Sequence, residues 1–241
     1  MQIRSVLFIV GVLLVCVGAS LVLPLGVSLW YGDGAFLGLL SSLVIMVGGG
    51  LALAYTNRSQ TPLNLTLRDG FAVVGICWIV ASFAGGLPFV LTSTASVTDA
   101  VFEAASGFTT TGATIFADIE GLPHGLLMWR SLTHWLGGLG IILLSLIVLP
   151  LLGVGGMQLY RAEVTGPSPD KLTPRMQDTA LTLWRVYCLM TIMLTVLLYI
   201  AGMDWFDALN HSFSTVATGG FSTKNNSIAA YPQASIQWIL I

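Results

Sequence analysis

Charged side chains are scarce in this sequence. Only 9 Lys and Arg and 11 Asp and Glu occur among 241 residues, or 8% of the chain, whereas hydrophobic residues make up 55%. A soluble domain carries about 25% charged residues, so this chain has too few to cover a surface in water. The formal net charge of −2 also gives no basic surface for nucleic acid. The composition excludes a soluble enzyme or a nucleic-acid-binding protein and indicates an integral membrane protein.

Groups that carry chemistry are equally scarce. The three cysteines, Cys16, Cys77 and Cys188, lie in apolar blocks without CxxC or metal-ligand spacing, which is typical of small buried residues rather than disulfides or ligands. His124 and His134 have no second ligand at a metal-binding spacing, and no Ser-His or HExxH arrangement occurs. We therefore expect no catalytic site, no metal centre and no bound cofactor.

Long apolar runs, by contrast, are abundant. A helix needs about 20 apolar residues to span a bilayer, and the blocks of that length lie at roughly 5–30, 36–56, 70–92, 132–153 and 181–202. The first block resembles a signal peptide because Arg4 precedes it, but its length favours a retained helix. A sixth block starts near 234 and stops inside a helix, so we expect the chain to be part of a longer protein.

The basic residues are distributed unevenly over the loops. If the N-terminus is cytoplasmic, seven of the nine bases lie on or near that side, and only Arg130 and Lys224 lie outside, which satisfies the positive-inside rule. Arg130 and Arg185 fall at helix ends in this topology, where we expect their side chains to reach the headgroups. The same topology predicts a cation-attracting outer mouth with these acids: Asp33, Asp99, Glu103, Asp118, Glu120, Asp204 and Asp207.

Two segments that are too short to span, 97–116 and 205–224, share one pattern. Each has about 12 helix-compatible residues followed by a tract rich in Thr and Gly. An ungapped offset of 108 residues pairs Asp99 with Asp207, Ala100 with Ala208, Ser106 with Ser214, Thr110 with Thr218 and Gly112 with Gly220. The chain therefore contains a repeat of helix, short re-entrant helix, Thr/Gly tract and helix.

The Thr/Gly tracts are the candidate functional feature. Irregular backbone at membrane depth is tolerated only when it is buried in protein or lines a water-filled path. Glycine reaches backbone angles that turn its carbonyl toward an axis, and threonine adds a hydroxyl oxygen. Such oxygens replace the hydration shell of a monovalent cation, and the C-terminal end of the short helix adds the negative end of its dipole. Ordinary extracellular turns are the alternative, which two matched copies disfavour.

Polar and small residues around the tracts are expected to be structural. Asp99 and Asp207 open the short helices, where a carboxylate caps free N–H groups. Glu103 and His211 occupy matching positions one turn later, and we expect them to pack or to hydrogen-bond to the tract. The run Gly137-Gly138-Leu139-Gly140 predicts close helix packing against the first re-entrant helix.

These features resemble the Trk/Ktr/HKT superfamily of potassium transporters, and within it the TrkH family of the bacterial Trk uptake system. The resemblance covers essentially the whole chain, and the linker motif favours TrkH over its Ktr relatives. The motifs that carry it are Leu87-Pro88-Phe89, Thr98-Asp99-Ala100, Thr109 to Thr114, Trp135 to Ile142, the linker Gly155 to Glu163, His211 to Thr215 and Gly219 to Thr223.

The resemblance implies an all-α polytopic membrane protein with potassium-channel-like repeats, four of them around one pore in a complete family member. This chain would contain a helix pair, one repeat and most of a second, without the third and fourth repeats or the gating loop of the third. The implied divisions are an N-terminal transmembrane helix pair at 1–66, a first repeat at 67–153, a cytoplasmic linker at 154–179 and a second repeat, truncated in its last helix, at 180–241.

The resemblance also implies a function, potassium uptake across the bacterial inner membrane by a symporter, with K⁺ as the transported ion. The filter residues carried over from the family are Thr110, Thr111, Gly112, Ala113, Thr218, Gly219, Gly220 and Phe221. The ungapped repeat favours Gly220 as the central glycine of the second tract, and a slip of one residue would choose Gly219.

Partners are implied in the same way. Family members are homodimers in the lipid bilayer and bind a cytosolic nucleotide-binding regulatory subunit, TrkA in the Trk case. The alternative from another functional class is a non-conducting membrane scaffold or interaction protein, because two tracts alone make half a pore.

Overall fold

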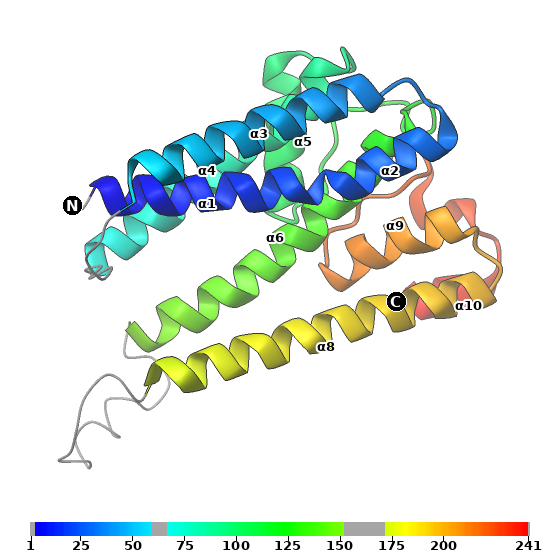
Figure 1. Cartoon of the computed structure of the whole chain (residues 1–241). Helices are drawn as coiled ribbons and strands as arrows, with labels where there is room; N and C mark the ends of the chain where they lie inside the picture. The colour runs from blue at the N-terminus through cyan, green and yellow to red at the C-terminus, as the bar shows by residue number, and fades with distance from the viewer. Residues whose placement is uncertain (1–2, 59–66, 152–171, 241) are drawn as a thin grey trace.

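The structure is a computed structural model that describes residues 3–58, 67–151 and 172–240 (Figure 1). Every regular element in these ranges is a helix, so the predicted all-α fold class is confirmed. The helices are α1 (Ile3–Ser20), α2 (Val22–Tyr31), α3 (Phe36–Thr56), α4 (Leu67–Leu91), α5 (Val97–Phe108), α6 (His124–Leu151), α8 (Leu172–Ile200), α9 (Trp205–Val216), the 3₁₀ turn η2 (Ser227–Ala230) and α10 (Ala234–Leu240).

Four helical stretches among the described residues are long and apolar enough to cross a bilayer. They are Ile3–Tyr31, Phe36–Thr56, Asp69–Leu91 and Asp178–Ile200, which confirms four of the predicted spans. The remaining predicted span, at 132–153, overlaps α6 over residues 132–151, and the 28 residues of α6 extend about 42 Å at 1.5 Å per residue. The described residues therefore form a bundle of long helices, and the 12-residue helices α5 and α9 lie among them.

The first span is broken once, between α1 and α2. Leu21 bonds back only three residues, with its N–H 3.1 Å from the Gly18 carbonyl. Pro24, in the first turn of α2, has no N–H to donate to the preceding turn, so a regular helix cannot run through this point. A single apolar block in the sequence thus becomes two helices on nearly one line (Figure 1).

Two helix starts lie upstream of the predicted ones. α6 begins at His124 and not near 132, and the Asp33 carboxylate accepts a 2.7 Å hydrogen bond from the Gly125 N–H in its first turn. α8 begins at Leu172, where Pro174 is compatible with a first turn. The cytoplasmic linker predicted at 154–179 lies outside the described residues as far as 171, and its remaining positions are helical.

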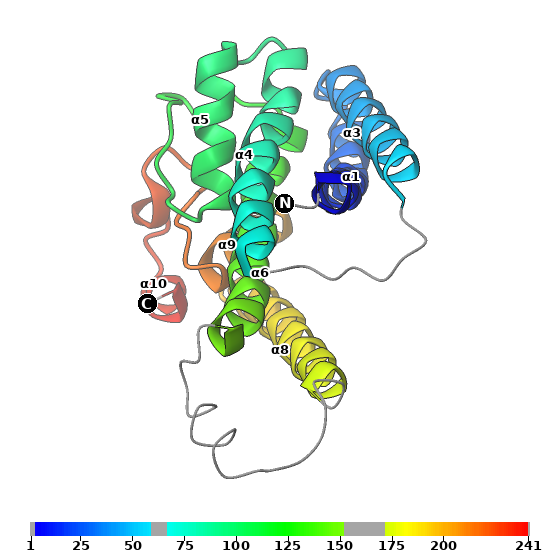
Figure 2. The same cartoon turned by 90° about the vertical axis from the view of Figure 1, so that its left-hand side faces the viewer.

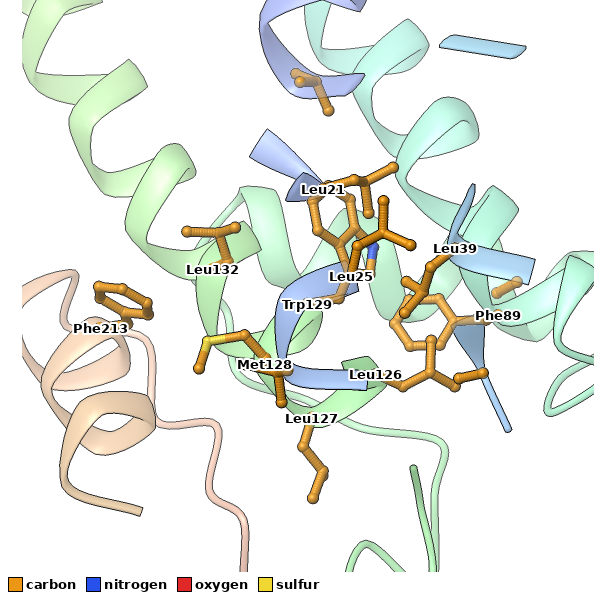
Figure 3. Close-up of a cluster of buried hydrophobic side chains, with 14 of the residues drawn as sticks. Leu21, Leu25, Leu39, Phe89, Leu126, Leu127, Met128, Trp129, Leu132 and Phe213 are labelled. Carbon is orange, nitrogen blue, oxygen red and sulfur yellow. The ribbon is translucent and has the colours of Figure 1, made fainter. Parts of the chain in front are cut away.

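Helix α6 packs against helices that precede it and helices that follow it in the chain. In both views α1 lies beside α3 and α4 beside α5 (Figures 1 and 2), while α6 contacts α2, α5, α8 and α9. Figure 3 shows the core where these helices meet, with Leu132 of α6 facing Phe213 of α9 and Leu126 near Leu39 and Phe89. Trp129 is fully buried there and donates a 2.9 Å hydrogen bond from Nε1 to the Gly85 carbonyl of α4. Helix α6 therefore links the N-terminal helices to both short helices.

The contact between α1 and α3 generates a stability prediction. A β-carbon at Gly50 would lie 2.7 Å from the Gly11 carbonyl oxygen, whereas one at Gly48 meets nothing within 4 Å. We expect Gly50→Ala to destabilise the protein by about 1–3 kcal/mol through overpacking. Gly48→Ala should be neutral or stabilising by up to about 1 kcal/mol, because alanine is the better helix former.

Thermal unfolding of the two purified variants in the same detergent tests this difference. Each kcal/mol corresponds to a midpoint shift of roughly 2–4 °C at this chain length. Equal midpoints for Gly50→Ala and Gly48→Ala would show that α1 and α3 do not approach as closely as described.

Candidate functional site

The two short helices start alike. Each has 12 residues. The N-caps are Ser96 and Asp204, which are 108 residues apart like the other matched positions of the repeat. The side chain of each N-cap accepts a hydrogen bond from a backbone N–H of the first turn. Asp99 donates its N–H to Ser96 Oγ at 3.3 Å and accepts the Ser96 hydroxyl at 2.8 Å, so the N-cap and the third helical residue bond to each other. The prediction that Asp99 and Asp207 cap these helices is therefore wrong in detail, because the caps lie three residues earlier.

The tracts that follow the helices have matching backbones. Thr110 and Thr218 both have left-handed φ angles, of 55° and 56°, and Gly112 and Gly220 follow with φ of 76° and 92°. The N–H of the residue between each pair returns to the short helix, from Thr111 to the Ser106 carbonyl at 2.9 Å and from Gly219 to the Ser214 carbonyl at 2.7 Å. The backbone counterpart of Gly112 is therefore Gly220 and not Gly219.

The two tracts lie directly against each other. A β-carbon added at Gly112 would overlap the Gly219 carbonyl oxygen, and one at Gly219 would overlap the ring of His134. Gly219 is buried against α6, whereas its neighbours Thr218 and Gly220 are exposed. The structure thus brings the predicted filter residues of both copies together. In the second tract Thr218 and Gly220 are exposed, and Gly219 between them is buried.

Each tract is tied to its short helix by one matched hydrogen bond. In the first copy, Thr114 Oγ1 donates to the Glu103 carboxylate at 2.9 Å, and the Ile115 N–H donates to its other oxygen at 3.0 Å. In the second copy, His211 Nε2 lies 3.0 Å from Ser222 Oγ. The prediction that Glu103 and His211 hydrogen-bond to the tracts is confirmed.

Arg130 is placed differently from its prediction. Its side chain is 1% exposed and its Nε lies 2.7 Å from Glu103 Oε1. It also donates to Thr114 Oγ1 at 3.1 Å and to the Ser222 carbonyl at 3.2 Å. The expectation that Arg130 reaches the headgroups is wrong, because α6 starts earlier than predicted and carries this residue into the protein.

Phe221 is the point where the two tracts differ most. Its counterpart in the first tract is the exposed Ala113, whereas the Phe221 side chain is 3% exposed. The guanidinium carbon of Arg130 lies 4.2 Å from its ring centre, and the His134 ring stacks on it at 4.0 Å. The side chain of this predicted filter residue therefore packs on α6, so any part of Phe221 in a filter would be its backbone carbonyl.

Asp207 organises the chain beyond the second tract. Its carboxylate accepts hydrogen bonds of 2.7 Å from Thr223 Oγ1 and from the Tyr231 hydroxyl, and Lys224 Nζ lies at 3.3 Å. Burial raises the pKa of the Asp207 carboxyl, but these hydrogen bonds and the ammonium outweigh it, so the pKa lies below its ordinary value. Asp207 in its charged form therefore anchors the loop that follows the second tract.

Asn225 joins the loops that follow the two tracts. Its side-chain oxygen accepts a 2.6 Å hydrogen bond from the Ile119 N–H, and its amide nitrogen donates to Asp118 at 3.1 Å. Its backbone N–H donates to Glu120 at 3.1 Å. Nothing in the sequence marked Asn225, because a single polar loop residue has no periodicity or motif.

The glycine run on α6 packs against the ends of both short helices. A β-carbon at Gly137 would overlap the Phe108 carbonyl oxygen at the end of α5. One at Gly138 would lie 3.0 Å from the β-carbon of Ala217, which follows α9. The prediction of close packing against the first re-entrant helix is confirmed, and the same glycine run also packs against the end of the second.

Among the described residues, no group of three His, Cys, Asp or Glu side chains could hold a metal ion.

Comparison with known proteins gives one family. The model of the TrkH family, described as cation transport protein, matches residues 40–241. The Trk system potassium uptake protein TrkH of Halomonas elongata is 46% identical over 99% of this chain and 50% of its own length. The protein of the same name from Escherichia coli K12 is 42% identical over all of this chain and 50% of its own length.

A solved structure agrees with these relatives. The crystal structure of the potassium transporter TrkH from Vibrio parahaemolyticus is similar with a TM-score of 0.88 at 38% sequence identity, over 100% of this chain and 48% of that one. The chain therefore spans about half the length of the curated relatives that it matches.

The tract geometry predicts an order of stabilities for three alanine variants. Gly34 and Gly220 have positive φ, of 80° and 92°, with open space around a β-carbon, so each Gly→Ala change should cost only the left-handed strain of about 1–2 kcal/mol. Gly112→Ala adds the overlap with the Gly219 carbonyl and should cost about 1–3 kcal/mol more. Thermal unfolding in detergent checks the order, and a Gly112→Ala variant as stable as Gly34→Ala would contradict the contact between the tracts.

Proposed function

Because the chain belongs to the TrkH family of cation transport proteins, we propose that it takes part in potassium uptake across the bacterial inner membrane and forms part of the ion path itself. The family is one of transporters and not of enzymes. The relatives are named as potassium uptake proteins of the Trk system, but the chain spans about half of their length, so uptake by the complete protein is part of the proposal.

One observation supports this proposal above the others, the matched backbone of the two tracts. In each tract a left-handed Thr is followed by a residue with ordinary φ and then by a left-handed Gly. Left-handed residues turn their peptide groups in directions that a regular helix or strand does not allow, so carbonyl oxygens of such a tract can face an axis. A short row of carbonyl oxygens on one side, beside the C-terminal end of a short helix, is suited to a desolvated monovalent cation.

The proposed ion ligands follow from this geometry. We assign the first tract to Thr110, Thr111, Gly112 and Ala113, and the second to Thr218, Gly220 and their neighbours Gly219 and Phe221. Gly220 is the better candidate for the central glycine of the second tract, since Gly220 shares the conformation of Gly112 and is exposed, whereas Gly219 is packed against His134.

Orientation, organisation and partners are proposed on the same footing. A cytoplasmic N-terminus agrees with the excess of basic residues on that side, and the burial of Arg130 leaves Lys224 as the only base of the outer loops. The proposed divisions are the helix pair at 1–66, the repeats at 67–153 and 180–241 and the linker between them. A second copy and a cytosolic nucleotide-binding subunit are the proposed partners, and coupling to another ion as a symporter belongs to the same proposal.

A non-conducting membrane scaffold is the second candidate function. The observation that favours it is that the chain holds only two tracts, which would line part of a pore. The two candidates differ in a direct measurement, ⁸⁶Rb⁺ uptake by cells that lack their own potassium uptake systems and express the complete reading frame that encodes this chain. Uptake above the level of the empty vector supports transport, and its absence in cells that contain the protein in the membrane supports the scaffold.

Arginine at the tract glycines gives the matching mutational prediction. We expect Gly112→Arg and Gly220→Arg to abolish ⁸⁶Rb⁺ uptake, because a bulky cation would occupy the ion path. Gly34→Arg is the control, because Gly34 has a similar φ of 80° and lies in the loop before α3 with open space around it. The control should retain uptake, and normal uptake by either tract variant at equal protein level would refute the assignment of the tracts.

A further inference from the structure

The side chain of Arg130 contacts residues in or next to both tracts. Arg130 of α6 binds Glu103 at 2.7 Å on the first short helix and Thr114 at 3.1 Å just after the first tract. In the second copy it donates to the Ser222 carbonyl at 3.2 Å and lies 4.2 Å from the centre of the Phe221 ring. One guanidinium group thus contacts residues of both copies.

The geometry uses the planar fork of arginine. Nε bonds to Glu103, Nη2 to Thr114 and Nη1 to Ser222, so three nitrogens in one plane point to three separate segments. A lysine ammonium has the same charge but a single nitrogen, and it cannot hold these three positions at once. The contact is therefore specific to arginine.

The charge of Arg130 is balanced locally. Its side chain is 1% exposed, and that of its partner Glu103 is equally buried. A buried cation beside an ion path would repel a passing cation, but a paired carboxylate cancels most of this field. The pair thus contributes geometry to the tracts without adding a net charge.

The second copy has no such pair. The repeat offset matches Glu103 with His211. The helix after the second tract, α10, carries no basic residue in its described residues Ala234–Leu240. His211 is held within its own copy, by the Asp207 carbonyl at 2.8 Å and by Ser222. The guanidinium link therefore comes from α6 of the first repeat, and the second repeat supplies no equivalent of it in its described residues.

We propose that Arg130, held by Glu103, is a positioning residue that sets the spacing between the two tracts and thereby the discrimination between K⁺ and other monovalent cations. This inference rests on the proposed transport function. It differs from a purely stabilising role because the bonds to Thr114 and Ser222 end on residues two positions beyond the tract glycines.

The first test measures transport by arginine variants of the complete protein. Arg130→Lys keeps the charge and Arg130→Gln removes it, and both lose the fork. We expect each variant to raise the KM for ⁸⁶Rb⁺ about tenfold, the scale of one lost hydrogen bond to a charged group. We also expect Na⁺ to inhibit uptake more strongly relative to K⁺ than it does in the unchanged protein.

The double variant Glu103→Gln/Arg130→Gln separates positioning from folding. Each single Gln variant leaves an unpaired buried charge and should lower the amount of protein in the membrane, whereas the double variant removes both charges and should restore it. Because the fork is still absent, the double variant should keep the raised KM and the altered Na⁺ inhibition. A double variant that recovers both the amount and the KM of the unchanged protein would overturn the inference.

Two neighbours on α6 serve as controls. Ser131 is buried, and its hydroxyl bonds within the helix to the Leu127 carbonyl, so Ser131→Ala should change nothing. Trp129→Phe loses the bond to Gly85 and should lower the amount of protein at unchanged KM. A rise in KM for Trp129→Phe equal to that of the Arg130 variants would show general destabilisation and overturn the inference.

The two levels of the proposal fail in different ways. If the unchanged protein is present in the membrane and does not take up ⁸⁶Rb⁺, the proposed function fails and the positioning role fails with it. If the unchanged protein transports and every Arg130 variant keeps its KM and its Na⁺ inhibition, only the positioning role fails.

Discussion

The absence of side chains at two adjacent positions of α6 is the constraint on which the arrangement of the tracts depends. Gly137 allows the Phe108 carbonyl to approach the helix backbone, and Gly138 allows Ala217 to do the same on another side. Both short helices end at these points, inside the protein, where their last carbonyl groups need close and defined surroundings. A larger residue at either position would move a helix end and the tract that follows it, so the placement of both tracts is set by one helix.

The burial of Arg130 changes the electrostatics that the loop charges suggest. Seven acids lie on the proposed outer side, but Glu103 is paired with Arg130, and Asp207 with Lys224. Asp33, in addition, bonds to the start of α6. The exposed acids that remain are Asp99, Asp118, Glu120 and Asp204. The attraction of cations to this face therefore comes from loop and helix-start residues in contact with water, where salt screens it, and the groups next to the tracts contribute little net charge.

The sequence predicted the repeat and its periodicity well, because identical residues at a constant offset report a shared backbone. It also predicted the bonds of Glu103 and His211 to the tracts, since both follow from helical spacing.

The start of α6 was misplaced because His124 and Arg130 interrupt its apolar pattern, and this error alone put Arg130 on the surface. The caps at Ser96 and Asp204 were missed for a local reason, since Ser and Asp are equally good caps and the two sites are not identical in sequence. The bridge through Asn225 joins segments over 100 residues apart, and no local pattern encodes it.

The left-handed threonines show how the two tracts are kept alike although their neighbours differ. A β-branched residue is strained at positive φ, yet Thr110 and Thr218 adopt it to within one degree of each other. Each is fixed between a short helix, through the N–H of the following residue, and a downstream hydroxyl, Thr114 or Ser222, that is itself bonded. Strain of this kind persists only where the surroundings determine the backbone on both sides. The side chains beyond the glycines are then free to diverge, and this accounts for an exposed Ala113 in one tract and a buried Phe221 in the other on the same main-chain path.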